Sequence, residues 1–347
     1  APRWGMVSPE EIERVDVLYG PFSAAYPGNS VGAVVDYVTR MPTRLEAHVK
    51  LSGFASNFDL YNSHSSPAGQ QIDLSLGSRS GNWSWWLSAS RTHSKGQALV
   101  FGNRLVSAGT VGNAGTPVTG AVLGLSPSNQ PWWLVGGSTI YDTTQEQAKL
   151  KVAYDFSPTV RATYTLGAWN NTTHGSVDTY QRDALGRPVY SGRVNIGGRS
   201  YNLDAPSAAL APTETALTHY MHGLSVKSHT GGVFDWEVAA SLFDYASDTS
   251  RTPTTPLPGA FNGGPGRTTD MGGSGWHTFK AAGTWRPTGS ADGVGAHVVE
   301  FGFQQDTARL RTSVGNTLDW IRGPVVAPFS AFNGNTRLQS LYVQDTW

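Results

Sequence analysis

Apolar and polar residues alternate with a period of two through most of the chain after Pro42. From Ala148 to Phe156, and again from Val160 to Ala168, the apolar residues fill the even-numbered positions. The stretch 82–91 alternates in the same way, although Trp86 falls among its serines. Successive side chains of a β-strand point to opposite sides, so this pattern is typical of strands. It predicts an all-β chain whose strands each separate two different environments.

Ten alternating segments are present, and we expect each to form a strand. They lie near residues 45–58, 69–79, 83–95, 144–156, 159–171, 214–229, 233–247, 275–286, 297–312 and 336–347. The connections between them alternate in length. The short ones are 80–82, 157–158, 230–232 and 287–296, and the long ones are 59–68, 96–143, 172–213, 248–274 and 313–335.

This alternation puts the long loops at one end of the predicted sheet and the short turns at the other. Bacterial outer-membrane barrels have this asymmetry, with short turns facing the periplasm and long loops facing outside. A soluble up-and-down barrel has no physical reason to collect its extra length at one end. Aromatic residues near strand ends are candidates for the belts at the membrane interfaces. They are Trp83, Tyr154, Phe156, Trp236 and Trp285.

The composition agrees with a transmembrane β-barrel but does not establish it. Charged residues are 14% of the 347 residues, against roughly 25% in an average soluble protein. Hydrophobic residues are only 39%, which excludes a helical membrane protein. A glycine-rich soluble sandwich fits the same composition. The formal net charge is zero, so nothing predicts binding to nucleic acid. The absence of cysteine excludes disulfides, thiolate metal sites and cysteine nucleophiles, and no cofactor is implied.

The first residues, APRWGMVSPEE, contain neither the basic region nor the apolar region of a signal peptide. No apolar run approaches the roughly 18 residues of a transmembrane helix. An outer-membrane protein must be exported, so we expect the chain to be mature or truncated.

Residues 12–42 form the most informative segment, IERVDVLYGPFSAAYPGNSVGAVVDYVTRMP. Two β-type runs flank a stretch of glycine, proline, serine and asparagine. Gly20 and Pro21 predict a turn, because proline fixes φ and lacks a donor. The tripeptide 27–29 (Pro-Gly-Asn) predicts a second turn.

This segment closely resembles the end of the plug domain of TonB-dependent outer-membrane receptors. In that family, a run like IERVEVLRGP precedes a turn rich in tyrosine and glycine and a strand like GGVINIITK. The matching residues are Ile12, Glu13, Arg14, Val15, Asp16, Val17, Leu18, Gly20, Pro21, Tyr26, Gly32, Val34, Val35, Val38 and Thr39. Tyr19 and Asp36 replace the arginine and asparagine that are usual there.

The resemblance implies a division into the C-terminal part of a plug domain (1–42) and the first portion of a transmembrane antiparallel β-barrel (43–347). Barrels of this plugged type have 22 strands. We therefore expect about ten strands of a larger barrel, with both ends missing. The last residues, LQSLYVQDTW, resemble an internal barrel strand, and the TonB box that the energy-coupling partner grips is not present.

Arg14 and Asp16 share one face of a predicted plug strand. One interpretation is that they form ion pairs with charges on the inner barrel wall and latch the plug. The candidate partners are Lys149, Lys151, Asp155 and Arg161. The alternative is that Arg14 and Asp16 are solvated strand charges.

Aromatic residues and arginines in the long loops are candidate ligand contacts, because this combination suits anionic, aromatic iron chelates. They are Trp132, Trp133, Tyr180, Arg182, Arg187, Arg193, Arg199, Trp320 and Arg322. The alternative is that these residues pack the loops on each other.

Other chemistry has weaker support in the sequence. His219 and His222 lie three residues apart, which on a strand means opposite faces, so they are not expected to share a metal. An outer-membrane protease with an Asp–His site at the rim would use Asp244, Asp248, His174 and Asp178. No signature fixes such a site, and the chain is not expected to be an enzyme.

By resemblance, the chain is expected to be part of a TonB-dependent active transporter in the bacterial outer membrane. Its expected partners are outer-membrane lipid, the TonB complex and a scarce ligand, with a ferric siderophore the first choice. Iron uptake is thus the leading hypothesis. A passive porin-like channel is the main alternative, and segment 12–42 argues against it.

Overall fold

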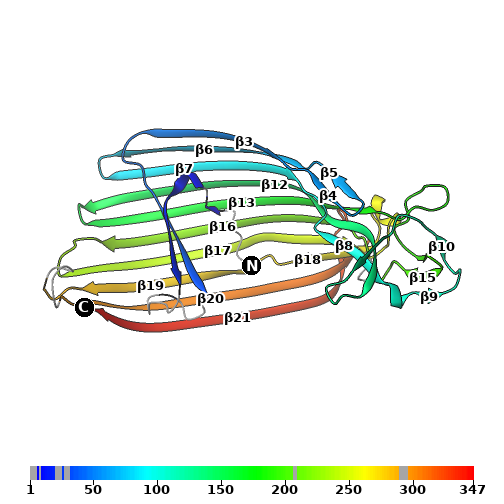
Figure 1. Ribbon diagram of the computed structural model, residues 1–347. Coiled ribbons are helices and arrows are strands. Elements are labelled where there is room, and N and C mark those ends of the chain that lie inside the picture. The colour runs from blue at the N-terminus through cyan, green and yellow to red at the C-terminus, as the bar shows by residue number, and fades with distance from the viewer. Residues whose placement is uncertain (1–5, 8, 20–25, 27–31, 206–208, 289–295) are drawn as a thin grey trace.

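The computed structural model describes residues 6–7, 9–19, 26, 32–205, 209–288 and 296–347. Its main feature is one large antiparallel sheet in which ten long strands follow one another in chain order, each bonded to the next (Figure 1). The strands are β3 (Glu46–Ala55), β6 (Ala68–Ser80), β7 (Trp83–Lys95), β12 (Pro131–Ser157), β13 (Val160–Thr179), β16 (Thr213–Ser228), β17 (Phe234–Pro253), β19 (Gly275–Trp285), β20 (Val298–Thr317) and β21 (Val325–Thr346). The predicted all-β class and antiparallel order are confirmed.

Several strands extend further toward the long loops than predicted. β12 starts at Pro131 instead of 144, and β21 starts at Val325 instead of 336. The pairing continues there, but the alternation does not. In β12 a bulge between Gly137 and Ile140, with φ of 59° at Thr139, shifts the side on which residues point. Prediction from alternation therefore ended these strands too early, and loops 96–143 and 313–335 are shorter than expected.

The long connections lie at one end of the sheet, as predicted, and they are folded (Figure 1). The first holds the hairpin of β4 (Phe58–Leu60) and β5 (Ser63–Ser65), and the second holds β8 (Val100–Leu105) and β11 (Val122–Leu125). β9 (Thr110–Val111), β10 (Thr116–Pro117), β14 (Arg193–Ile196) and β15 (Arg199–Asn202) form a small sheet. Its buried core combines Val194, Ile196 and Tyr201 of this sheet with Val135 of β12 and Leu203. We call this unit the cap.

Further short elements complete this end. They are η4 (Gly259–Asn262) and β18 (Gly266–Asp270), and β18 pairs with both β17 and β20. A short 3-10 helix, η3 (Val106–Ala108), follows β8.

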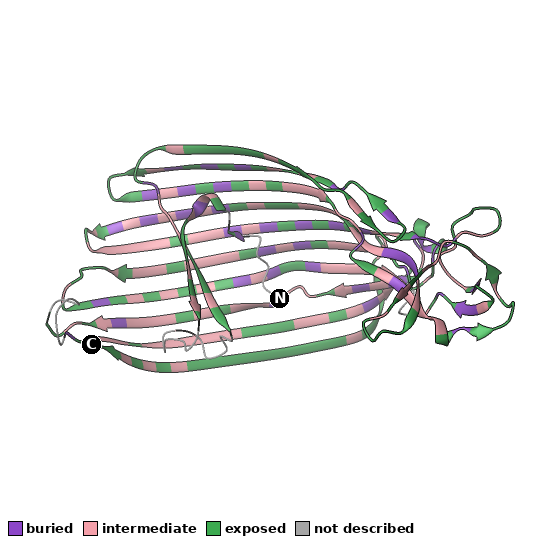
Figure 2. Cartoon of the chain, viewed as in Figure 1, coloured by how far each residue is buried: buried purple, intermediate pink, exposed green. Residues whose placement is uncertain are grey.

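The two faces of the large sheet differ in the way that the alternation predicts. On β6, Leu74 and Leu76 are exposed, whereas Asp73 and Ser75 on the other face are 6% and 9% exposed. Figure 2 shows the resulting bands of buried and exposed residues along the strands. A soluble protein buries its apolar rows and exposes its polar ones. Among the described residues, the outward rows of the strands are largely apolar and exposed, and the polar rows line the hollow of the sheet.

Aromatic side chains gather on the outer face at the short-turn end. The rings of Trp83 and Tyr154 lie 4.6 Å apart, and Tyr154 contacts Phe156 at 5.0 Å. Further along the same end, Phe234 pairs with Trp285 in the sheet register. Of the aromatic residues predicted for the belt, Trp83, Phe156, Trp236 and Trp285 are exposed, and Tyr154 is half-buried.

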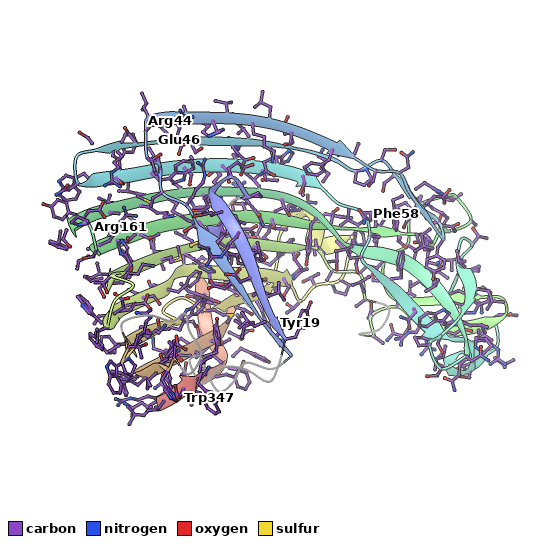
Figure 3. The ribbon with its side chains drawn as sticks, turned by 60° about the vertical axis from the view of Figure 1, so that its left-hand side comes forward. Tyr19, Arg44, Glu46, Phe58, Arg161 and Trp347 are labelled. Carbon is purple, nitrogen blue, oxygen red and sulfur yellow. The ribbon has the colours of Figure 1, made fainter. Side chains whose placement is uncertain are left out.

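The N-terminal residues lie on the concave side of this sheet, where they form η2 (Pro9–Glu11) and an antiparallel hairpin of β1 (Ile12–Tyr19) and β2 (Ala33–Thr39). Figure 3 shows the hairpin, with Tyr19 at its far end, enclosed by the curve of the sheet. Gly32 has φ of 90°, a conformation that favours glycine. Tyr26 is half-buried. Gly20 and Pro21 lie outside the described residues.

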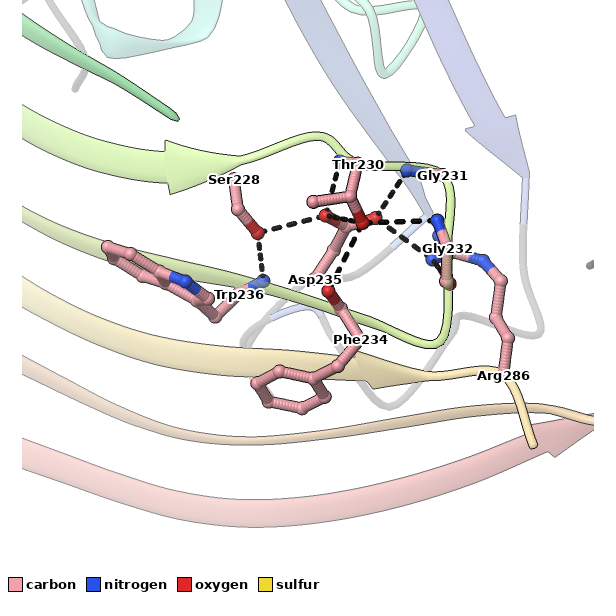
Figure 4. Close-up of polar contacts among 8 residues, drawn as sticks. All are labelled: Ser228, Thr230, Gly231, Gly232, Phe234, Asp235, Trp236 and Arg286. Atoms are coloured by element: carbon pink, nitrogen blue, oxygen red, sulfur yellow. Dashed lines mark hydrogen bonds and ion pairs between the residues drawn. The ribbon is translucent and has the colours of Figure 1, made fainter. Parts of the chain in front are cut away.

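One tight turn shows how the short-turn end is fixed. The Asp235 carboxylate accepts hydrogen bonds from the backbone amides of Thr230 (2.6 Å) and Gly231 (3.1 Å) and from the hydroxyl of Ser228 (2.9 Å) (Figure 4). The Arg286 guanidinium donates to the same carboxylate at 2.9 Å. Burial alone would raise the pKa of Asp235. The hydrogen bonds outweigh it and hold the pKa well below its usual range.

Asp235→Ala is expected to lower the free energy of unfolding by about 2–3 kcal/mol, because it removes the charged acceptor that several partly buried hydrogen bonds share. The low native pKa also means that this stability is present above the unfolded pKa of about 3.9 and is lost as the pH falls through the lower native value. Denaturant titrations at neutral pH and near pH 3 measure both effects. Asp59→Ala, at an exposed position, is the control. Equal losses in the two variants would contradict this role for Asp235.

Candidate functional site

The contact between the N-terminal segment and the concave wall is the candidate site. Its centre is an ion pair between Glu11 and Lys149, whose side chains are 1% and 5% exposed. Lys149 belongs to the inward row of β12, which the alternation of that strand directs into the hollow. Glu11 ends η2, one residue before β1 begins. A carboxylate and an ammonium thus meet away from solvent.

Lys151, the next inward residue of β12, binds the other strand of the hairpin. Its ammonium donates to the Thr39 hydroxyl at 2.7 Å and to the Arg40 carbonyl oxygen at 2.9 Å. The two lysines therefore hold the start of β1 and the end of β2, which lie together at the open end of the hairpin. Arg40 also donates a backbone hydrogen bond to Glu11 at 2.9 Å, which ties these two anchoring points together.

A more exposed ring of contacts surrounds this centre. Glu10 pairs with Lys50 of β3 at 2.8 Å, and Arg40 pairs with Glu46 of β3 at 3.1 Å. The Arg40 guanidinium also lies 4.9 Å from the centre of the Trp86 ring. Partial burial opposes the ionisation of Glu10, but the hydrogen bond and charge of Lys50 outweigh it and lower the pKa. Each contact joins the N-terminal segment, or the residue following its hairpin, to the wall.

An apolar contact extends the site along the wall. Met6 is buried in a cluster with Trp169, Leu217, Phe243 and Tyr245, which come from three neighbouring strands. Between this contact and the charged one lies a cavity of about 190 Å³. Polar residues of the wall, among them Asp73 and Gln147, line it together with Val7 and Pro9.

The predicted latch therefore has the right lysines but different partners. Arg14 and Asp16 form an ion pair with each other at 3.0 Å, and both side chains are largely exposed. They lie farther along the hairpin than the residues that reach the wall, so the prediction that they bind it is wrong. The other two wall charges are also engaged, because Asp155 pairs with Arg161 at 2.6 Å and with Arg79 at 2.8 Å.

Sequence reasoning missed Glu10, Glu11 and Arg40 as wall contacts. A signal was present, because Glu10 and Glu11 directly precede the first β-type run and Arg40 directly follows the second. In a hairpin those positions lie together at the open end. Sequence could not show which end of the hairpin meets the wall.

Five of the predicted ligand contacts pack the loops instead. The Trp133 indole N–H donates to the Tyr201 hydroxyl at 3.2 Å inside the cap, and Trp320, 2% exposed, donates to the Ala260 carbonyl oxygen. The Tyr180 hydroxyl and the Ser63 hydroxyl lie 2.7 Å apart. Arg182 and Arg199 donate to backbone carbonyl oxygens. The alternative of loop packing thus accounts for these side chains.

Four candidates keep accessible side chains. Arg187 pairs with Asp183 at 2.8 Å but is 70% exposed. Arg193 lies exposed on β14, and Trp132 is half-buried at the start of β12. Arg322 lines a cavity of about 250 Å³ together with Arg251 and Glu214. The four residues come from different parts of the loop end and do not form one site.

The histidines lie as predicted, on opposite faces. His219 points inward, 3.0 Å from the Asp248 carboxylate and stacked on Tyr245. His222 points outward, and its Nδ1 lies 2.8 Å from the Tyr164 hydroxyl. Across the part of the chain that the structure describes, no group of three or more His, Asp or Glu side chains is arranged to hold a metal.

The four residues of a rim protease do not come together. His174 pairs with Glu214 at 2.5 Å, and Asp248 binds His219 inside the sheet. Asp244 pairs in register with Gly275, at a distance along β17 from Asp248 and on the other face. Within the described residues, no helix is both long enough and apolar enough to cross a bilayer.

Comparisons with known proteins yield a structural likeness only. No family model and no curated protein matches the chain. The crystal structure of BauA, the ferric preacinetobactin receptor from Acinetobacter baumannii, is 15% identical, with a TM-score of 0.48. The likeness covers 96% of this chain and 51% of that receptor, so the chain spans about half its length. OpdL from Pseudomonas aeruginosa is 11% identical over 87% of this chain and 99% of its own, with a TM-score of 0.12. Neither score is high enough to support an argument about function.

Lys149→Met is expected to release the N-terminal segment from the wall, because it leaves the Glu11 carboxylate buried beside an apolar side chain. Breaking a buried pair in this way costs about 3–5 kcal/mol, whereas replacing both partners costs much less. Limited proteolysis of residues 6–42 measures the release. Cleavage is expected to rise strongly in Lys149→Met and to fall back in the double variant Glu11→Gln/Lys149→Met.

Lys50→Met is the matched control, because its partner Glu10 lies in the more exposed ring. A surface pair contributes about 0–1 kcal/mol, so little change in cleavage is expected. Equal cleavage in Lys50→Met and Lys149→Met would show that burial of the Glu11–Lys149 pair does not hold the segment.

Proposed function

We propose that the chain is part of a TonB-dependent active transporter of the bacterial outer membrane. The observation that carries the proposal is a segment of plug-like sequence, held by buried charges in the hollow of a sheet with an apolar outer face. Residues 12–42 carry the family resemblance, and Glu11, Thr39 and Arg40 attach that segment to Lys149 and Lys151. In this proposal, residues 1–42 are the end of a plug domain and 43–347 are part of its barrel.

The contacts suit a plug that has to be moved. The attachment is concentrated at the base of the hairpin, in a few ionic and hydrogen-bonded contacts and the Met6 cluster. A buried ion pair adds little net stability, but breaking one side of it is unfavourable. Such a contact stays closed at rest and opens in one step when the segment is pulled. The pull would come from the TonB complex acting on a TonB box, which is a family property.

A ferric siderophore is the proposed cargo, and import into the periplasm is the proposed direction. The accessible side chains at the loop end are Trp132, Arg187, Arg193 and Arg322, which keep their role as candidate contacts for an anionic, aromatic chelate. No covalent step is required of any residue. Outer-membrane lipid would contact the exposed apolar rows of the ten long strands.

A passive porin is the main alternative. It would leave the hollow open to solutes and would need no energy coupling. The buried contacts of the N-terminal segment favour a closed hollow instead, because a porin gains nothing from placing Glu11 and Lys149 out of solvent.

The test is to crosslink the N-terminal segment covalently to the concave wall of the sheet. In a full-length receptor freed of any cysteine outside this chain, which has none itself, Glu11→Cys and Lys149→Cys are joined by a short thiol-reactive crosslinker. Crosslinking is expected to abolish uptake of a radiolabelled ferric siderophore while surface binding persists. The reason is that the segment can no longer leave the wall.

The matched control joins two wall residues, Thr163→Cys and Ser225→Cys, which are register partners on β13 and β16. It is expected to transport normally. Undiminished uptake by the Glu11–Lys149 crosslink would contradict the proposal. Free solute flux through the uncrosslinked receptor in a liposome swelling assay would favour the porin.

A further inference from the structure

A small niche lies beneath the N-terminal segment, where that segment meets three strands of the wall. Asp73 of β6 and Gln147 of β12 are both register partners of Ser90 on β7, which lies between them. Ser90 is much shorter than its two neighbours, so it leaves space between their side chains. Glu10 of η2 completes the lining of this niche, which measures about 10 Å³. That is room for one water-sized particle.

Three oxygen atoms in the lining of the niche are buried without a hydrogen-bond partner among the described residues. They are Oε2 of Glu10, Oγ of Ser75 and Oε1 of Gln147. Ser75 is 9% exposed. Buried polar atoms nearly always have a partner in a folded protein, so three such atoms around one niche indicate a bound particle. The described residues themselves enclose these atoms, so no segment beyond them is needed to bury the site.

The niche has an excess of negative charge. Asp73 is 6% exposed, and both of its carboxylate oxygens accept from the neutral Gln71 amide at 2.9 Å. Among the described residues Asp73 forms no ion pair, and the Lys50 ammonium attracts it only from a longer distance. Lys50 binds the other oxygen of Glu10, Oε1, at 2.8 Å, and its side chain is 53% exposed. Two carboxylates therefore face one ammonium.

A water molecule fits this niche in size but not in charge. Its two hydrogens could bond to the Glu10 and Gln147 oxygens, but the second carboxylate would keep its charge out of water. A calcium ion takes hard oxygen ligands, such as carboxylates, amide oxygens and waters, at about 2.3–2.6 Å. The lining offers such oxygens. The cavity of about 190 Å³ shares Asp73, Ser90 and Gln147 with the niche, so it has space for the waters that complete a calcium shell.

We propose that Glu10, Asp73, Ser75 and Gln147 bind one calcium ion, which bridges the N-terminal segment to the wall. Glu10 supplies the ligand from the segment, and β6 and β12 supply the others. Two carboxylates and two neutral oxygens make up the set, which distinguishes it from a cluster of three or more acidic side chains. The inference does not rest on the proposed function, because it needs only the contact between the segment and the wall.

Asp73→Asn tests the site, because asparagine has the same size and still accepts from the Gln71 amide but carries no charge. The full-length protein is purified in mild detergent, and equilibrium dialysis with radioactive calcium measures binding. The affinity of one site is expected to fall by at least about tenfold, since losing even an outer partner of a metal ligand costs about 10–100-fold. Ser75→Ala removes one neutral ligand and is expected to weaken the same site less.

Asp59→Asn is the matched control, because its carboxylate is 81% exposed and lies outside the niche. It is expected to bind calcium like the wild type. Circular dichroism confirms that each variant keeps its β-structure.

Limited proteolysis of residues 6–42 gives a second readout. An ion that binds only while the segment is attached suppresses detachment by the factor 1 + [Ca²⁺]/Kd, which is about tenfold at ten times the Kd. Calcium is therefore expected to slow cleavage about tenfold in the wild type and to have little effect in Asp73→Asn.

The outcomes separate this inference from the proposed function. Equal calcium affinity in the wild type, Asp73→Asn and Ser75→Ala would overturn the inference and assign the niche to water. Cleavage of the wild type that does not respond to calcium would also overturn it. Calcium binding at this site in a protein that imports no siderophore would support the inference and contradict the proposed function alone.

Discussion

Two lysines placed out of water in the concave face of a sheet impose the main constraint on this structure. Lys149 and Lys151 are each 5% exposed, and isolated charges in such surroundings are highly unfavourable. The structure satisfies them from a segment more than a hundred residues earlier in the chain. The Glu11 carboxylate neutralises one, and the hydroxyl of Thr39 and the carbonyl oxygen of Arg40 accept from the other. The wall and the N-terminal segment therefore depend on each other for their polar contacts.

The same constraint explains the two faces of the sheet. Polar residues at alternate positions point into the hollow, where some form ion pairs with Glu11 and Arg40. The apolar residues between them then point outward, where in the described part of the chain nothing covers them. Such a surface is unfavourable in water and favourable in lipid. The aromatic belt around Trp83 and Tyr154 bounds this apolar surface at the short-turn end. Hydrogen bonding adds a second condition, because β3 and β21 each pair on one side only among the described residues. Unpaired strand edges are unfavourable in lipid.

The sequence predicted the order and number of the long strands because alternation is strong wherever one face is apolar. The prediction from sequence failed where the alternation of apolar and polar residues stops. β12 continues beyond Thr144 to Pro131 through a bulge, and its first residues are the consecutive apolar run 132–135, so no period of two marks this part. The loop residues illustrate a second limit. Trp133 and Tyr180 have the composition of ligand contacts, but whether an aromatic residue packs inside a cap or faces a ligand depends on contacts between segments distant in sequence. The anchoring lysines were predicted because they occupy the polar positions of a strongly alternating strand. Their partners were not, because Arg14 and Glu11 lie three residues apart and only the placement of the hairpin distinguishes them.

The central claim is that the sheet turns one row of side chains to lipid and the next to a polar hollow. A scan of single cysteines from Ala162 to Ala168 of β13, each carrying a spin label in the membrane-reconstituted receptor, measures this most directly. The account predicts that accessibility to oxygen, which concentrates in lipid, peaks at even positions, and that accessibility to a water-soluble nickel chelate peaks at odd positions. Labels that show no alternation, or alternation of the opposite phase, would contradict it.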